Sequence, residues 1–215
     1  IDNFLIEKNS FIFESVEKGK IKGRYTIFGK NPDKIWEFNN NNCKLFYKNK
    51  SIALKGSPKR NIEKIIENFN FEIPKGLPPI SSILSGYFSY DVIRYIEKIP
   101  NNTKNDLNIP DSRILRPKNI IVHDNVEKKL YFIVNIFNDE KIINFNKKFS
   151  EINKQIEEMV FLANYNSSIT NENINKLSKI KSNISKDKFI KNVKKAKKYI
   201  KIGDIFQVVL SQRFE

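Results

Sequence analysis

The sequence has 215 residues, of which 40% are hydrophobic, enough for one large or two small domains with a buried core. Seventeen phenylalanines and eight tyrosines argue against disorder of the chain as a whole. No apolar run reaches the roughly 18 residues of a membrane span, and no signal-peptide pattern opens the chain. The single cysteine, Cys43, excludes an intrachain disulfide framework and a cysteine-based metal site. We therefore expect a cytoplasmic protein with no membrane partner.

The chain is strongly basic, with 39 Lys and Arg against 24 Asp and Glu and a net charge of +15. Such a charge suggests a nucleic-acid partner. However, the excess is mostly lysine spread along the chain, and Lys, Asn and Ile are the residues of A/T-rich codons. The one dense lysine cluster, at 191–198, lies on a predicted helix that also has an apolar face. A solvated helix face is therefore favoured over a phosphate-binding face, and no nucleic-acid partner is expected.

The first 54 residues predict a meander of short antiparallel strands. Alternating or apolar segments separated by turn residues place strands at 11–13, 24–28, 35–38, 45–47 and 52–54. The Asn-Pro-Asp segment at 31–33 predicts a turn between two of these strands, and Asn49 the turn of a hairpin.

Helical spacing and caps organise the middle of the chain. Asn61 is the predicted N-cap of a helix with one apolar face (Ile62, Ile65, Ile66 and Phe69). The stretch 81–100 predicts a strand–helix corner that bends at Gly86, buries its tyrosine rings and pairs Asp91 with Arg94. A hairpin is expected from 120–122 to 130–134. An amphipathic helix follows, with Phe145, Phe149, Ile152, Ile156 and Val160 on one face.

Residues 164–184 are poor in large apolar side chains, which predicts a linker or mobile loop between a first domain at 1–163 and the start of a second at 185–215. Ser185 caps a helix with Phe189, Val193, Ala196 and Ile200 facing inward, and Gly203 ends it. Alternation at 205–214 then predicts a strand with an exposed apolar edge. The expected fold class is α+β, with an antiparallel β-sheet sandwich core and flanking helices.

Motifs that would carry chemistry are few. The sequence has no phosphate-binding loop, no dinucleotide fingerprint and no metal-ligand spacing. His123 stands alone at a predicted hairpin, which favours a structural role, and Cys43 is interpreted as a bystander. No residue of the chain is predicted to be catalytic or to bind a metal.

Two polar constellations remain. Glu14, Ser15, Arg24 and Tyr25 sit at strand positions that would line a pocket for a small zwitterion, the carboxylate holding an ammonium and the arginine a carboxylate. Strand-edge residues in solvent would show the same spacing, so spacing leaves the two open. The second constellation lies on the predicted strand at 205–214 and would face either a polar cavity or solvent. It consists of Gln207, Ser211, Gln212 and Arg213.

Several of these segments resemble a known family, the component I chain of anthranilate synthase. Phe-Glu-Ser at 13–15 and Gly-Arg-Tyr-Thr-Ile-Phe-Gly at 23–29 are similar to its Leu-Glu-Ser and Gly-Arg-Tyr-Ser-Phe-Ile-Gly elements. Further similar segments occur in the same order, namely 76–79, 86–97, 109–111 and 203–214. The departures are Phe13 for leucine, Thr26 for serine, and the Ser-Arg-Ile-Leu-Arg-Pro that continues the Ile-Pro-Asp segment. The sister family, aminodeoxychorismate synthase component I, tends to have Cys-Tyr-Gln-Val-Asn-Leu-Ala-Gln where this chain has 205–212, so that segment favours the anthranilate enzyme.

The resemblance implies an enzyme that converts chorismate to anthranilate with Mg²⁺, using ammonia from a glutamine amidotransferase subunit, in tryptophan biosynthesis. Tryptophan inhibits such enzymes by binding near the Leu-Glu-Ser element, which corresponds to Glu14 and Ser15. Extension of this effector site to Arg24 and Tyr25 is a hypothesis from their place on the adjacent strand.

Both ends of the chain look cut, and the chorismate and Mg²⁺ ligands of the family lie beyond Glu215. The expected fold is therefore a truncated anthranilate synthase component I fold that is inactive alone. Aminodeoxychorismate synthase component I and a basic, non-enzymatic binding module remain the alternatives.

Overall fold

The computed structural model describes residues 7–15, 23–70, 72–102, 105–164 and 180–214. The chain divides into two compact units, Ile1–Ser167 and Ser168–Glu215, and each is described by itself. The first unit contains the sheet, and the described part of the second, residues 180–214, contains one helix with its flanking segments. Among the described residues, no helix has both the length and the apolar character that crossing a membrane requires.

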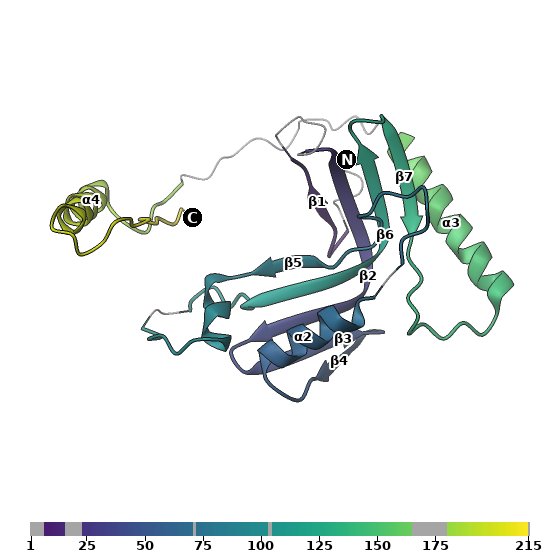
Figure 1. Ribbon diagram of the computed structural model, residues 1–215, viewed down its shortest axis with the longest axis horizontal. Coiled ribbons are helices and arrows are strands. Elements are labelled where there is room, and N and C mark those ends of the chain that lie inside the picture. The colour runs from purple at the N-terminus through teal and green to yellow at the C-terminus, as the bar shows by residue number, and fades with distance from the viewer. Residues whose placement is uncertain (1–6, 16–22, 71, 103–104, 165–179, 215) are drawn as a thin grey trace. The chain divides into compact units, whose positions relative to one another are not determined.

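The first unit is built on one antiparallel sheet of seven strands in the order β4-β3-β2-β6-β5, with β1 paired to β2 and β7 to β6. The strands are β1 (Phe11–Phe13), β2 (Tyr25–Asn39), β3 (Asn42–Tyr47), β4 (Lys50–Ala53), β5 (Ser85–Phe88), β6 (Ser112–Asp124) and β7 (Lys129–Val134). In Figure 1 the long central pair β2 and β6 bends midway, so that one arm of the sheet carries β1 and β7 and the other carries β3, β4 and β5. The α+β class with an antiparallel sheet is confirmed, and the core is a single sharply bent sheet.

The bend replaces a turn that the sequence predicts. The Asn-Pro-Asp segment does not separate two strands: β2 runs through it for 15 residues, with an irregularity in its pairing to β6 between Pro32 and Lys34. Pro32 faces Pro117 across the ladder, and Asn31 has a φ of 53°. Because proline has no amide hydrogen to donate, two facing prolines interrupt the ladder, and a bulge lets both strands bend and continue.

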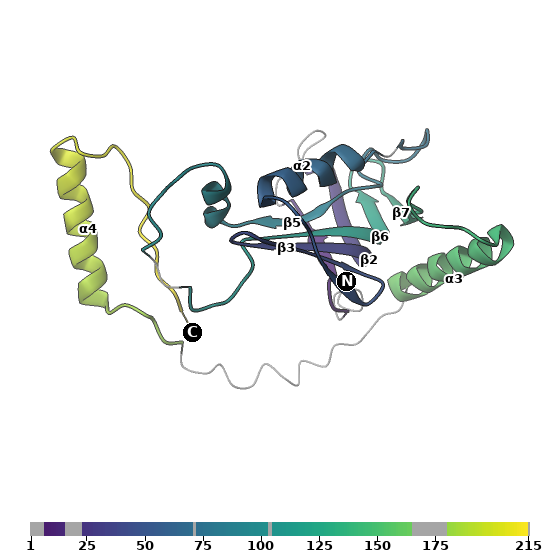
Figure 2. The ribbon, with the colours of Figure 1, turned by 90° about the horizontal axis from the view of Figure 1, so that it is seen from below.

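Two helices cover the arms. α2 (Pro58–Asn68) packs Ile65 against Trp36, Phe38 and Ile114 of one arm. α3 (Phe145–Asn164) packs Met159 against Ile121 of the other. Figure 2 shows the two helices on different parts of the bent sheet. On its opposite face, the second arm buries a third cluster against the segment around residues 80–83 (Ile120, Val122 and Ile133).

The inward face of α3 differs from the prediction. The helix itself is confirmed, but Phe145 and Phe149 are 71% and 57% exposed, whereas Met159 is 1% exposed. The side chains of α3 that pack in the core cluster of this arm lie in the second half of the helix (Ile156, Met159 and Leu162).

The start of α2 also corrects the sequence interpretation. Ser57 is the N-cap, and its side chain accepts a hydrogen bond from the Arg60 amide, with Pro58 in the first turn. Asn61 lies inside the helix and is buried. Its amide nitrogen donates to the carbonyl oxygens of Lys55, Gly56 and Ser57. It therefore binds the loop before the helix instead of capping the helix.

The 81–100 stretch forms β5 followed by a short 3-10 helix, η1 (Tyr90–Tyr95), and the predicted Asp91–Arg94 pair is present at 2.7 Å. Gly86 lies within β5, where an added Cβ would be 2.0 Å from the Arg113 carbonyl oxygen, so close strand pairing explains this glycine. The expected burial of the tyrosine rings is wrong for Tyr90, which is 81% exposed. Of the tyrosines in this stretch, only Tyr95 packs against a core cluster.

In the second unit, α4 (Lys186–Lys201) begins at Ser185, whose side chain accepts from the Lys188 amide, and Gly203 follows its end with a φ of 84°. Both ends are as predicted. The predicted strand at 205–214 is wrong: within the described residues 180–214 this segment makes one isolated bridge, between Ser182 and Phe214. A strand requires a continuous ladder to a neighbour, which this unit does not supply. Most of the predicted linker, 165–179, lies outside the described residues.

Candidate functional site

The predicted effector residues lie near one end of the β1–β2 pair. β1 runs antiparallel to β2, with Phe11 opposite Gly29 and Phe13 opposite Ile27. Glu14 and Ser15 follow Phe13 directly and are exposed. Because the register advances toward the start of β2, the continuation of β1 approaches Tyr25, the first residue of that strand. The tertiary structure thus brings the Phe-Glu-Ser and Gly-Arg-Tyr segments to the same end of the sheet.

The Arg24 guanidinium is already bound by carboxylates of this chain. Its Nε and Nη2 atoms donate to Asp124 Oδ2 at 3.0 and 2.7 Å, and Nη2 also donates to Glu127 Oε1 at 3.2 Å. The guanidinium carbon lies 5.0 Å from the centre of the Tyr25 ring, a cation–π distance. Both partner carboxylates raise the pKa of Arg24, the hydrogen bond to Asp124 most of all. Arg24 is therefore positioned beside Tyr25 by the end of β6.

Asp124 is the residue at this place that the sequence interpretation missed. Its side chain is 1% exposed, and its Oδ1 atom accepts from the amides of Val126 and Glu127 in the turn before β7. The hydrogen bond from Arg24, followed by those two amides, lowers the pKa of Asp124 to about 2. An Asp-Asn pair directly after an apolar strand was the available signal, because aspartate in that position commonly caps a turn.

Two other motifs of the resemblance meet at Asp111. The Tyr95 hydroxyl donates to Asp111 Oδ2 at 2.8 Å, and the Asn40 amide donates to the same oxygen at 2.7 Å. The Ser89 amide donates to the Asp111 carbonyl at 2.8 Å. Burial, followed by the hydrogen bond to Asp111, raises the pKa of the Tyr95 phenol well above its usual range. These contacts join η1 to the turn between β2 and β3, which is a structural role.

The remaining candidates lie apart from the β1–β2 end. His123 is in the ladder of β6, opposite Thr26 and Leu130. Cys43 is buried in the core beneath α2, and burial raises the pKa of its thiol. In the second unit Gln212 Nε2 donates to Ser182 Oγ at 2.6 Å, and the Arg213 amide donates to Asn183 at 3.0 Å. Of the second polar constellation, Gln212 and Arg213 therefore hold the segment after α4 to the segment before it.

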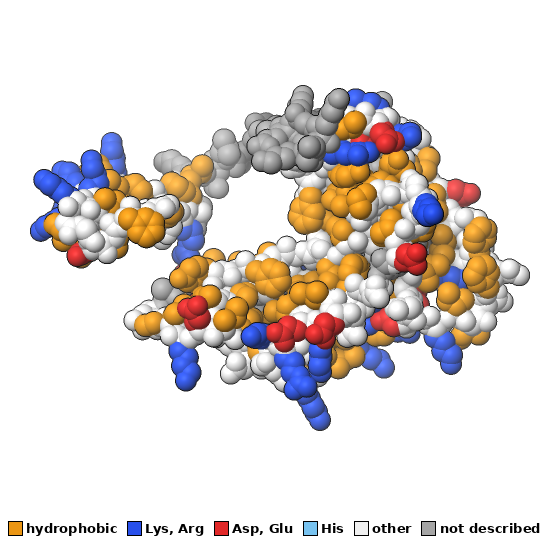
Figure 3. All heavy atoms as spheres, viewed as in Figure 1, with side chains coloured by type: hydrophobic (Ala, Val, Ile, Leu, Met, Phe, Trp, Pro, Cys, Tyr) orange, Lys and Arg blue, Asp and Glu red, His pale blue; other side chains and the backbone are white. Residues whose placement is uncertain are grey.

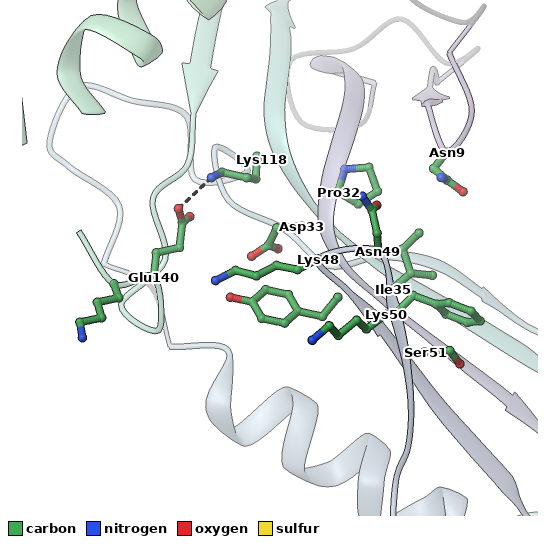
Figure 4. Close-up of a pocket in the computed structure, with 13 residues that line it drawn as sticks. Asn9, Pro32, Asp33, Ile35, Lys48, Asn49, Lys50, Ser51, Lys118 and Glu140 are labelled. Carbon is green, nitrogen blue, oxygen red and sulfur yellow. Dashed lines mark hydrogen bonds and ion pairs between the residues drawn. The ribbon is translucent and has the colours of Figure 1, made fainter. Parts of the chain in front are cut away.

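A cleft with a volume of about 770 Å³ lies on the bend of the sheet, and Figure 4 shows the residues that line it. Its carboxylates are paired, Glu140 with Lys118 at 2.9 Å and Asp33 with Arg116. Lys48 and Lys50, at the β3–β4 turn, add positive charge. None of the predicted effector residues lines it. Within the described ranges, no group of three or more His, Cys, Asp or Glu side chains is arranged to hold a metal ion.

Comparison with known proteins defines the class of protein that this sheet and these motifs represent. The family model for chorismate binding enzymes matches residues 8–215, and the chain belongs to this family. The chain is 36% identical over 209 residues to anthranilate synthase component 1 of Acetivibrio thermocellus, a match that covers 94% of this chain and 42% of that protein. It is 34% identical over 230 residues to the chloroplastic anthranilate synthase alpha subunit 1 of Oryza sativa subsp. indica, covering 97% and 39%.

The fold is likewise that of a solved relative. The crystal structure of anthranilate synthase component I from Streptococcus pneumoniae TIGR4 superposes with a TM-score of 0.67 at 22% identity, over 93% of this chain and 43% of that one. The chain thus spans about two-fifths of the length of the curated relatives that it matches.

Proposed function

We propose that this chain is the N-terminal part of an anthranilate synthase component I, whose complete form converts chorismate and ammonia to anthranilate and pyruvate in tryptophan biosynthesis in the cytoplasm. The observation that carries the proposal is the family match over 8–215, joined to 36% identity with a protein of that name. In this proposal the ammonia comes from glutamine through a separate amidotransferase subunit.

Chorismate and Mg²⁺ are assigned to the part of the relatives that follows the matched region. In this proposal no residue of the 215-residue chain has a part in holding the ion. We accordingly expect the 215-residue chain alone to be inactive. Chorismate turnover by the purified chain would contradict this assignment.

Feedback inhibition by tryptophan is proposed to act through Glu14, Ser15, Arg24 and Tyr25. Two features support this role: Glu14 and Ser15 are exposed, and β1 leads them toward Tyr25. A guanidinium has five N–H donors, and the three bonds from Arg24 to Asp124 and Glu127 use only Nε and Nη2. Arg24 would therefore meet the carboxylate of an amino acid through Nη1 while keeping Asp124.

The experiment measures the thermal unfolding midpoint of the chain with and without L-tryptophan, because a ligand that binds only the folded state raises the midpoint. We expect a rise that Ser15→Phe abolishes and that Arg24→Ala reduces. Arg60→Ala, an exposed position on α2, is the matched control and should leave the rise unchanged. A folded chain by circular dichroism that shows no rise would contradict an effector site formed by these residues.

The alternative functions have their own tests. Anthranilate and aminodeoxychorismate synthases differ in the position of the new amino group, so the complete enzyme must yield an ortho-amino product if the proposal holds. A basic binding module would rest on α4, whose lysines gather as the blue atoms at one end of Figure 3. Binding to DNA or RNA that weakens steeply with salt would favour that module.

A further inference from the structure

The ring of Phe11 fills the space in which any side chain on Gly29 would lie. A Cβ built on Gly29 would be 2.2 Å from Phe11 Cζ and 2.3 Å from Cε1. The two residues are register partners across β1 and β2, and Gly29 is buried. The absence of a side chain at position 29 therefore creates the seat for this aromatic ring.

Other side chains lie around this position of the Phe11 ring. Phe28, Ile121 and Met159 line the small remaining void beside Phe11 and Gly29. Met159 is the buried anchor of α3, so this void is bordered by both the sheet and the helix. The Phe13 ring lies 4.9 Å from the Phe11 ring, which extends the packing along β1.

β1 is a short strand, and the segment before it is held by Asn9, which accepts from Arg113 Nη2 at 2.7 Å, and by Glu7, which pairs with Lys30 at 2.7 Å. β1 contains three residues, pairs with β2 alone among the described strands, and leads directly into Glu14 and Ser15. A three-residue strand supplies only a few ladder hydrogen bonds, so the packing of the Phe11 ring adds to what holds β1 on β2. Displacement of the ring would shift β1 as a unit, and with it the two residues that follow.

We infer that Phe11 and Gly29 are positioning residues for the Glu14–Ser15 effector element, an inference that rests on the proposed tryptophan site. Neither residue needs to contact the ligand. The seat fixes where β1 lies on β2, and that position decides whether Glu14 and Ser15 meet Tyr25 at the end of the strand pair.

The test compares Gly29→Ala with an alanine substitution at a second glycine, Gly76, that should also lower the stability of the fold. Gly29→Ala must displace the Phe11 ring from this position, because Cβ atoms do not approach ring carbons to 2.2 Å. Gly76→Ala is the control: Gly76 has a φ of 91° and no atom within 4 Å of an added Cβ, so the change adds backbone strain without touching β1. Phe11→Ala and the double variant Phe11→Ala/Gly29→Ala complete a double-mutant cycle. Neither variant has the ring that would clash with a Cβ at position 29.

Two readouts are taken on the whole chain, amide hydrogen exchange at 11–13 and the midpoint rise with L-tryptophan. In Gly29→Ala we expect exchange at 11–13 to be about 10-fold faster, with the β2–β6 ladder unchanged, and the tryptophan rise to fall by more than about half. In the Phe11→Ala background the same alanine should change exchange by less than about 2-fold, because no ring remains to expel. Gly76→Ala should keep the full tryptophan rise.

Faster exchange without loss of the tryptophan rise would overturn the inference, as would unchanged exchange in Gly29→Ala or an equal loss of the rise in Gly76→Ala. If the wild-type chain shows no rise, the proposed effector site fails and the inference falls with it. If the wild-type chain responds and Gly29→Ala responds equally, the inference alone fails.

Discussion

The Arg24 guanidinium donates two hydrogen bonds to a single carboxylate oxygen of Asp124, so the residue before β2 is bound to the last residue of β6. The other oxygen of Asp124 accepts two amides of the turn that leads to β7. One shielded carboxylate thus connects three strands at the end of the sheet where the proposed effector residues lie.

Replacement of this carboxylate should destabilise the sheet at that end. Asp124→Asn keeps the size of the side chain but removes the charge that holds Arg24 and satisfies two amides. We expect Asp124→Asn to lower the thermal unfolding midpoint by roughly twice as much as Glu127→Gln, or more. Glu127 is 43% exposed, and exposed ion pairs contribute little to stability. Equal losses in the two variants would contradict a special role for Asp124.

Acid should weaken the same region. The pKa of Asp124 is held at about 2 in the folded chain, below its ordinary value of 3.8. The carboxylate therefore stabilises the fold at pH above about 4, and this contribution is lost as the pH falls from about 4 toward 2. Asp139, with a pKa also at about 2, acts in the same direction. Urea unfolding between pH 5 and 2.5 should show a smaller drop in stability for Asp124→Asn than for wild type, and parallel curves would contradict the assignment.

Arg116 lies beside the bend of the sheet and is bound to two carboxylates there. Its Nε and Nη2 atoms donate to the two oxygens of Asp33 at 2.8 and 2.5 Å, Nη2 also donates to Asp139 at 2.9 Å, and the guanidinium lies 3.9 Å from the Phe137 ring centre. The Arg116 side chain is 9% exposed and that of Asp33 11%.

Arg116→Met should cost about 3–5 kcal/mol in urea unfolding, because it leaves Asp33 shielded without its partner. Arg116→Lys should recover little of this loss, since a single ammonium cannot reproduce the two parallel bonds. Arg113→Met, on the same strand but with a side chain 37% exposed, is the control and should cost within about 1 kcal/mol. A loss in Arg116→Met no larger than in the control would refute this account of Arg116.

The loop before α2 depends more on Asn61 than on the helix cap. Asn61→Ala removes an amide whose two N–H groups are shared among the three carbonyls at 55–57, and should cost about 1–3 kcal/mol. Ser57→Ala removes one capping bond and should cost about 1 kcal/mol. Asn68→Ala, exposed at the end of α2, should stay within about 0.5 kcal/mol. Urea unfolding ranks the three, and a larger loss for Ser57→Ala than for Asn61→Ala would contradict the prediction.

Tyr95 and Tyr90 lie at the two ends of η1 and should respond differently to removal of the hydroxyl. Tyr95→Phe loses the 2.8 Å bond to Asp111 and should cost about 1.5–3 kcal/mol, the range for hydrogen bonds to charged groups. Tyr90 is 81% exposed, so Tyr90→Phe serves as the control with a cost near zero. Thermal unfolding of both variants decides whether the Tyr95–Asp111 bond stabilises the fold.

The amino-acid sequence by itself determined the elements whose signals are local. The hairpin β3–β4 follows from turn residues between apolar segments, with positive φ at Lys48 and Asn49. The limits of α4 follow from Ser185 and Gly203 in the same way. Each of these signals acts within a few residues, where the physics of caps and turns does not depend on the rest of the fold.

Only the tertiary structure decided the features that depend on a distant partner. β2 bends at Pro32 and does not stop there, because its pairing with β6 resumes at Lys34 and Arg116. Arg24 is held by Asp124, a carboxylate 100 residues away in the sequence. The seat of Phe11 exists because Gly29 lies opposite it on β2. The segment 205–214 has strand-like alternation, but an extended segment becomes a strand only when a neighbouring strand completes its hydrogen bonds.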